Sequence, residues 1–308
     1  MYRSHGVKKL RKTLIMPESR PPQQVRCRQI TTDDLYAIAS LLARGFPVRP
    51  RQDWQRALEV LRMHATPAGF PRYGYLLESG QRPVGAILMI SKEFGTEARR
   101  LVRCNVSSWC VEPEFRSYAA LLNARVLKHQ PATYLNISAA PHTWRTIEVQ
   151  GFTRYRQGVF VAVPLLSKTA RGCKVRRVHA HDPEHGDLPH DEIRLTDEHI
   201  GYGCLALCCT TGEGVFPFLF RHRRIKRRLV PCLQLIYCRS LEALAQCAGA
   251  LGRYLALRGL LLVLADADGP IAGVAGRYFP GHTPLYAKGA DVPRPGDLSY
   301  TEAALFGY

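Results

Sequence analysis

The C-terminal run from Lys288 to Glu302 is dense in polar side chains that could bind an amine. Asp297 and Glu302 supply carboxylates and Tyr300 supplies a phenol, and these groups are suited to hydrogen bonds and ion pairs with an amine. The run is equally rich in proline and glycine, as an ordinary loop before a last strand would be. The sequence alone leaves both interpretations open.

The ten cysteines and the clustered histidines do not predict a metal site. No two cysteines form a Cys-x-x-Cys pair, and most lie in apolar runs such as 204–209, where a thiol behaves as a small buried hydrophobe. Four histidines fall in the polar stretch 167–191, which lacks the preformed geometry that a metal needs. We therefore expect no metal, reduced thiols and a cytoplasmic location.

A crevice for a ligand is predicted where two neighbouring strands end. Apolar runs predict a strand over 103–111, a helix over 115–129 and a strand over 133–138. A unit of this kind is right-handed and leaves a crevice at the carboxyl ends of its strands. A strand, two helices and a hairpin are predicted before it, over 25–90, and a last strand follows it, over 155–163.

The residues at the end of the first of these strands have a characteristic spacing. Val111, Pro113 and Arg116 follow one another as Val-x-Pro-x-x-Arg before a turn and a helix. This segment resembles the cofactor-binding segment of the GNAT acyltransferases. The element order over 25–163 and the Gly151-Phe152 pair before the last strand also resemble that family, so the likeness covers roughly half of the chain.

The resemblance implies an α/β fold with a mixed sheet flanked by helices, and acyl-CoA as co-substrate without a metal. Cys110 and Val111 would offer backbone groups to the pantetheine arm. The residues implied to wrap the pyrophosphate at the helix N-terminus are Arg116, Ser117, Tyr118, Ala119 and Ala120. The implied reaction moves an acyl group from a thioester to the amine of a small molecule or a peptide.

Two positions of the turn depart from the family pattern. Ala119 and Leu121 stand where the family has glycines that allow close approach to phosphate. Three alternatives therefore remain open: a CoA-dependent enzyme, a transferase that uses an acyl carrier protein or aminoacyl-tRNA, and a non-catalytic binding protein. The net charge of +18 suits an anionic partner, but the arginines are scattered, so dedicated nucleic-acid binding is not expected.

The catalytic residues are less clearly marked. Ile147 occupies the position at which the family often has a tyrosine that protonates the departing thiolate. We name Tyr155 or a water as the proton donor, with His142 as a further side chain nearby in sequence; packing on the sheet is an equal alternative role for Tyr155. Asn136, on the second strand of the crevice, is predicted to hydrogen-bond the substrate or the pantetheine, although a strand asparagine is as often satisfied by local backbone.

The second half of the chain repeats the order of elements in shorter form. A hairpin over 205–220, a strand over 233–238, a helix over 240–258 and a strand over 260–265 are predicted. We predict two GNAT-like modules in tandem, the second degenerate; two unrelated α/β domains are the alternative. The predicted division is a basic flexible arm over 1–26, an acyltransferase module over 27–166, a linker over 167–192 and the second module over 193–308. The longest apolar stretch, 255–267, contains charges and is too short to span a membrane.

Overall fold

The computed structural model describes residues 24–96, 99–129, 131–182, 187–225 and 230–307. The elements of the first half, with η marking a 3-10 helix, are β1 (Val25–Gln29), η1 (Thr32–Asp34), α1 (Leu35–Gly45), α2 (Arg51–Met63), β2 (Gly74–Ser79), β3 (Arg82–Thr96), β4 (Arg99–Val111), η2 (Pro113–Tyr118), α3 (Ala119–Val126), β5 (Thr133–Asn136), η3 (Pro141–Thr143), α4 (Trp144–Val149), β6 (Thr153–Ala162) and η4 (Pro164–Leu166). Those of the second half are β7 (Lys174–Val178), α5 (His190–Gly201), β8 (Leu205–Thr211), β9 (Gly214–Ile225), β10 (Val230–Cys238), α6 (Leu241–Ala256), β11 (Val263–Ala267), β12 (Gly276–Lys288) and α7 (Glu302–Leu305).

All these strands form one sheet of 12 strands, in the order β1-β2-β3-β4-β5-β12-β6-β11-β10-β9-β8-β7. Two neighbouring pairs are parallel, β4 with β5 and β10 with β11, and the other pairs are antiparallel. The order is palindromic, because β1 to β5 run inward from one edge as β7 to β11 run inward from the other.

The last strand of each half crosses into the other half at the centre of the sheet. β12 lies between β5 and β6, and β6 lies between β12 and β11. β12 pairs with β5 at positions that include Tyr286 and Asn136. It also pairs with β6, where the register shifts between Pro280 and Leu285 and again between Leu285 and Tyr286. Each half therefore completes its sheet with a strand supplied by the other, which ties the two halves together.

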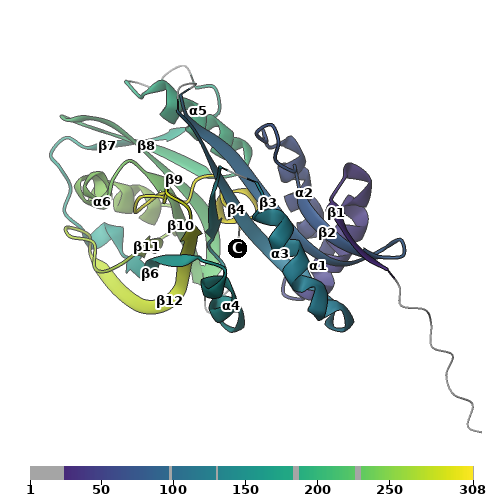
Figure 1. Ribbon diagram of the computed structural model, residues 1–308. Helices are drawn as coiled ribbons and strands as arrows, with labels where there is room; N and C mark the ends of the chain where they lie inside the picture. Colours follow the sequence, from purple (N-terminus) through teal and green to yellow (C-terminus); the bar gives the residue numbers. More distant parts are fainter. Residues whose placement is uncertain (1–23, 97–98, 130, 183–186, 226–229, 308) are drawn as a thin grey trace, which may run out of the picture.

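Alternation along the strands divides the apolar side chains between the two faces of the sheet. On β3, Leu88 and Ile90 face a cluster formed with α1, α2, α5 and α7, whereas Ile87 and Met89 face a cluster formed with α3 and α4. In the second half, α6 packs on the same face as α3 and buries Leu244 and the side chains around it. Figure 1 shows the helices distributed over both sides of the sheet.

Helix α6 illustrates how local sequence fixes an element. Ser240 caps its N-terminus by accepting a hydrogen bond from the Ala243 N–H at 3.1 Å. Gly252 lets η4 approach closely, because a Cβ at this position would lie 2.1 Å from the Leu165 nitrogen. The segment after β6 is thereby held against the second half of the chain.

The predicted α/β class, with a mixed sheet flanked by helices, is confirmed, and both predicted strand-helix-strand units contain a parallel strand pair. The linker predicted over 167–192 is wrong in part, because Lys174–Val178 forms the edge strand β7 and α5 begins at His190. An edge strand needs few apolar side chains, and β7 has only two valines among basic residues.

The predicted arm lies outside the described residues up to residue 23. The division into two modules stays a prediction. No helix in the described part of the chain is long and apolar enough to cross a membrane.

Candidate active site

A large cavity opens where the parallel strands β4 and β5 separate. The two strands pair only from Arg103 to Asn105, opposite Thr133 to Leu135, although β4 continues to Val111. Beyond the last pair lies a cavity of about 870 Å³. It is lined by the ends of both strands, by the loop between α1 and α2, by the starts of α3 and α4, and by the C-terminal residues Glu302, Phe306 and Gly307. The predicted crevice is therefore present as a hollow between two strand ends.

A bulge in β4 forms one wall of this cavity. The β3–β4 register shifts between Ala86 and Leu88, where two residues of β4, Ser108 and Trp109, stand opposite one residue of β3, Ile87. Ser108, inside the bulge, has a φ of +52°, which a non-glycine residue adopts only at a cost. A bulge leaves a residue out of the strand ladder, so backbone groups of Ser108 and Trp109, which line the cavity, are available to a ligand there. The sequence contains no glycine here and did not predict the bulge.

The structure brings part of the predicted cofactor segment to the cavity. Cys110 and Val111 line it from β4, Asn136 lines it from β5, and Arg116 and Ala119 line it from the turn that leads into α3. Arg116 is exposed and makes no ion pair with any residue that the structure describes.

The other residues of the predicted turn face solvent beside the cavity. Ser117, Tyr118 and Ala120 are exposed and are not among the residues that line it. Leu121, at one of the expected glycine positions, is 37% exposed and also lies outside the lining. Its side chain therefore does not fill the space that the glycine would leave free.

Glu302 places a buried carboxyl group in the wall of the cavity. Burial raises the pKa of this carboxyl above its ordinary value, while the hydroxyls of Ser107 and Ser138 and the charge of Arg49 partly oppose the rise. Its Oε1 atom has no hydrogen-bond partner among the described residues. A buried carboxyl with a free oxygen beside a cavity is suited to accept a proton or to bind a cationic group.

Asn105 holds the backbone of Glu302 at the point where the two strands part. Its Nδ2 donates to the Val106 carbonyl at 3.2 Å and, across the gap, to the Leu135 carbonyl at 3.4 Å. Its Oδ1 accepts the backbone N–H of Glu302 at 2.8 Å. One buried amide thus joins β4, β5 and the start of α7.

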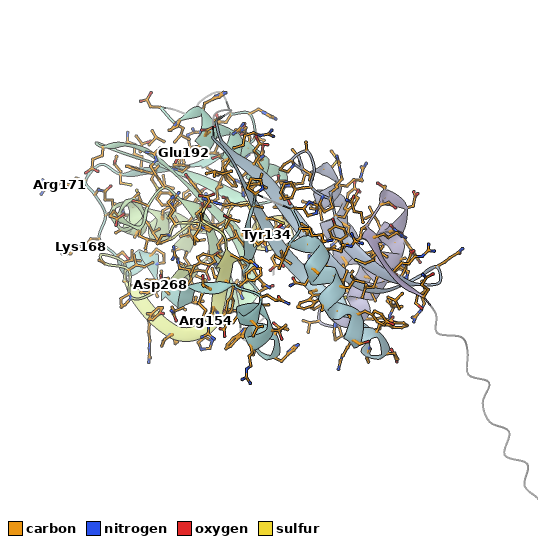
Figure 2. The ribbon with its side chains drawn as sticks, in the orientation of Figure 1. Tyr134, Arg154, Lys168, Arg171, Glu192 and Asp268 are labelled. Carbon is orange, nitrogen blue, oxygen red and sulfur yellow. The ribbon has the colours of Figure 1, made fainter. Side chains whose placement is uncertain are left out.

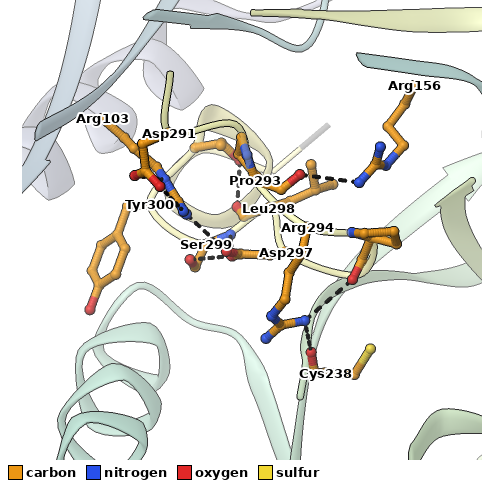
Figure 3. Close-up of polar contacts among 12 residues, drawn as sticks. Arg103, Arg156, Cys238, Asp291, Pro293, Arg294, Asp297, Leu298, Ser299 and Tyr300 are labelled. Atoms are coloured by element: carbon orange, nitrogen blue, oxygen red, sulfur yellow. Dashed lines mark hydrogen bonds and ion pairs between the residues drawn. The ribbon is translucent and has the colours of Figure 1, made fainter. Parts of the chain in front are cut away.

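Arg103 clamps the segment that leads to Glu302 (Figure 3). Its Nε donates to Asp291 Oδ2 at 2.7 Å, and its Nη1 donates to Asp297 Oδ2 at 2.9 Å. The other carboxylate oxygen of Asp297 accepts the Ser299 hydroxyl at 2.5 Å. Since these ion pairs are mostly buried, they restrict the path of the chain toward α7 more than an exposed pair would.

Two further arginines, Arg156 outside the segment and Arg294 within it, add contacts with the second half (Figure 3). Arg156 on β6 donates to the Pro293 carbonyl at 3.1 Å, and Arg294 donates to the Cys238 carbonyl at 2.5 Å. The segment also pairs with the end of β10, because the Leu298 N–H donates to the Ile236 carbonyl at 2.8 Å. The C-terminal run is therefore bound to both halves of the molecule.

This segment fills the place in the second half that corresponds to the cavity in the first. Between β10 and β11 the structure leaves a space of only about 10 Å³. Cys238 donates its N–H to the Gly296 carbonyl at 2.9 Å, so the end of β10 is occupied by the chain itself.

Tyr155 lies at this second place, away from the large cavity. It lines the small space together with Asp266 and Asp297, and its hydroxyl has no hydrogen-bond partner among the described residues. Burial raises the pKa of its phenol well above the ordinary value. The structure does not bring Tyr155 together with Asn136 and Cys110, whereas His142, the alternative donor, lines the large cavity.

The sequence named Glu302 as a possible amine ligand but placed it in the other module, and it did not single out Asn105 or Ser108. The signal for Asn105 was an amide in the middle of an apolar strand, which requires a specific partner when buried. No short-range pattern marks a contact across almost 200 residues, as between Asn105 and Glu302.

Comparison with solved structures identifies the fold. A GCN5-related N-acetyltransferase from Anabaena variabilis is similar at a TM-score of 0.58 and 10% identity, over 86% of this chain and 72% of that one. A candidate acetyltransferase from Pyrococcus horikoshii is similar at 0.57 and 14%, over 94% and 97%. A GCN5-related N-acetyltransferase from Kribbella flavida is similar at 0.53 and 17%, over 88% and 72%. No protein-family model and no curated protein sequence matches. The chain therefore has the fold of the GCN5-related N-acetyltransferases, at identities that establish the fold alone.

Proposed function

We propose that this chain is an N-acyltransferase that takes its acyl group from a CoA thioester and transfers it to the amine of a small molecule or a peptide. The observation that carries the proposal is the cavity between the ends of β4 and β5, which joins an exposed arginine turn to a buried carboxyl group. The acetyltransferase neighbours share the fold, and the chemistry rests on the residues of this cavity.

The acyl donor would lie between the two separated strands. Cys110 and Val111 would offer backbone groups to the pantetheine arm, and Asn136 would bind it from β5. The pyrophosphate would lie at the turn before α3, where Arg116 supplies positive charge and the N-terminal end of α3 supplies the positive end of the helix dipole. Ser117, Tyr118 and Ala120 surround this turn at the surface, and Ala119 lines its inner side.

The chemical step would use Glu302 as the general base. The carboxylate takes a proton from the ammonium form of the acceptor, and the free amine nitrogen attacks the thioester carbonyl. The C–S bond breaks as the C–N bond forms, and the nitrogen gives up its second proton to solvent to leave the neutral amide. The backbone groups of the β4 bulge are placed to stabilise the negative charge on the carbonyl oxygen. The departing thiolate takes its proton from the exposed His142 or from solvent, since Tyr155 lies outside the cavity.

Donor binding is tested by calorimetry with CoA and two charge-reversed variants. Arg116→Glu is expected to weaken binding about tenfold or more, because it puts negative charge beside the pyrophosphate. Arg125→Glu makes the same change of charge on an exposed part of α3 outside the cavity and is expected to bind CoA as the wild type does. Equal affinity for both variants would remove the turn from the donor site.

Transfer is tested by incubating the protein with acyl-CoA thioesters and pools of amines and detecting the acylated amine by mass spectrometry. Turnover with carrier-protein thioesters alone would replace CoA as the donor. Binding of CoA without turnover of any donor would indicate a non-catalytic binding protein.

We also propose that the chain is a tandem of two modules of one fold, the first over 27–166 and the second, degenerate one over 193–308 with β7 added at its edge. Gln234 on β10 supports this, since its Nε2 donates to the Leu235 carbonyl at 3.4 Å and to the Leu264 carbonyl at 3.3 Å. Asn105 makes the same two bonds on β4, to the next carbonyl and across the parallel pair. The palindromic strand order agrees with such a repeat.

A further inference from the structure

Three cysteine thiols from separate elements meet on the far side of the second half from the catalytic cavity. Cys173 lies just before β7, Cys209 lies on β8 and Cys247 lies on α6. Their three Sγ atoms all lie within 4.8 Å of one another. The absence of Cys-x-x-Cys pairs argues against a metal only for neighbours in sequence, whereas these three come together through the fold.

The position of the cluster combines burial with access. Cys209 and Cys247 are fully buried in the apolar cluster beneath α6, whereas Cys173 is half-buried at its margin. Cys173 follows the surface loop that carries Lys168 and Arg171, which Figure 2 labels at the outer edge of the molecule. Cys173 is therefore the member of the cluster that is closest to solvent.

We propose that Cys173, Cys209 and Cys247 form a binding site for a Zn²⁺ ion, with three thiolate ligands and a fourth position open to solvent beside Cys173. Tetrahedral coordination with Zn–S bonds of about 2.3 Å places the sulfur atoms about 3.8 Å apart, so the observed separations require only small movements. Thiolate ligands favour soft or borderline ions over Mg²⁺ and Ca²⁺.

Charge favours a divalent ion at this site. Three thiolates without a metal would be strongly unfavourable in an apolar core, whereas Zn²⁺ cancels two of the three negative charges. Each Zn–S bond replaces an S–H bond, so binding releases three protons to solvent and strengthens as the pH rises. The bound ion would tie the start of the edge strand β7 to β8 and α6.

The experiment is metal binding to the full chain after chelation, with Zn²⁺ and with Co²⁺ as a spectroscopic probe. The wild type is expected to retain one Zn²⁺ per chain after dialysis, to melt at a higher temperature when Zn²⁺ is present, and to show a thiolate-to-cobalt charge-transfer band with Co²⁺. Calorimetry in buffers of different ionisation enthalpy is expected to report the release of protons.

The matched variants are Cys209→Ser and Cys208→Ser. Both residues are buried on β8, but Cys208 faces the opposite side of the sheet, so its loss is expected to leave Zn²⁺ binding unchanged. Cys209→Ser is expected to lower the affinity at least tenfold and to abolish the cobalt band. Cys173→Ser, at the margin of the core, gives the same test should Cys209→Ser fail to fold. A wild type without stoichiometric Zn²⁺, or equal binding by Cys173→Ser and Cys208→Ser, would show that the three thiols only pack the core.

Discussion

At the scale of single residues, the candidate site depends on a carboxyl group that is costly to bury. Glu302 is 8% exposed, and burial raises its pKa. A raised pKa means that the protonated carboxyl is favoured in the folded chain. The free energy of unfolding therefore decreases as the pH rises from the ordinary pKa of a glutamate to the pKa in the folded chain. A group that opposes folding at neutral pH is typically retained for function.

Glu302→Gln is therefore expected to lower activity and raise stability together. Turnover should fall by about 10²- to 10⁴-fold, as for the loss of one general base, with CoA binding retained. The melting temperature at pH 8 should rise, because the variant buries no charge, and the gain should vanish at pH values below the ordinary pKa of a glutamate. In the wild type, turnover should increase with pH through a pKa above that ordinary value. Glu114→Gln removes an exposed carboxyl outside the lining of the cavity and is the control; if both variants lose activity equally, Glu302 is not the base.

At the scale of elements, the site is built by the clamp on residues 291–300. Tyr300, the last residue of this segment, has a φ of +55°. Its N–H donates to His199 Nε2 at 3.2 Å, and Lys92 Nζ lies 4.5 Å from its ring centre. This strained turn, together with the Arg103 ion pairs, directs the chain into α7 and brings Glu302 to the cavity.

Arg103→Met is expected to loosen this path without touching the cavity. It leaves Asp291 and Asp297 without their partner and should lower the free energy of unfolding by about 3 kcal/mol. Turnover should fall while CoA affinity changes little, because the donor turn is not altered. The control is Arg100→Met, on the same strand as Arg103. It removes an exposed ion pair with Glu93 of β3 and should lower the free energy of unfolding by about 0 to 1 kcal/mol. Urea unfolding and steady-state kinetics measure both effects; full activity in Arg103→Met would separate the clamp from the site.

Sequence patterns predicted most elements but not how the halves are joined. The hairpins and parallel pairs follow from local apolar runs and turns, as for Leu205–Thr211 and Gly214–Ile225. The exchange of β6 and β12 depends on which sheet edge each strand meets, and both strands would suit either edge. Apart from Asn136, the proposed donor side lies in one continuous segment, 109–122, so a local motif could mark it. The acceptor side could not, because Glu302 reaches the cavity only through tertiary contacts.

At the scale of the whole molecule, the two halves share a polar contact as well as a sheet. Lys92 on β3 donates to Glu198 on α5 at 2.7 and 2.8 Å, and His64 Nδ1 lies 2.9 Å from the Tyr202 hydroxyl. His199 lies beside them, fully buried, with Nδ1 donating to the Leu195 carbonyl at 2.7 Å. Because strands, core and these pairs cross between the halves, we expect one cooperative unfolding transition for the chain.

The pH dependence of that transition should reveal His199. Burial lowers its pKa from the ordinary value of 6.5 to about 4, since protonation would charge a buried ring whose Nε2 accepts the Tyr300 N–H. The unfolded chain binds this proton below pH 6.5 and the folded chain only below about 4, so stability falls as the pH drops through this window. From pH 7 to 5 the loss of stability amounts to about 2 kcal/mol.

His199→Asn keeps a donor for the Leu195 carbonyl but cannot titrate. Its free energy of unfolding, measured with urea, should therefore fall by about 2 kcal/mol less than that of the wild type between pH 7 and 5. His190→Asn, at the exposed start of the same helix, should follow the wild type. Parallel pH profiles for wild type and His199→Asn would show that His199 takes up its proton without opening the contact between the halves.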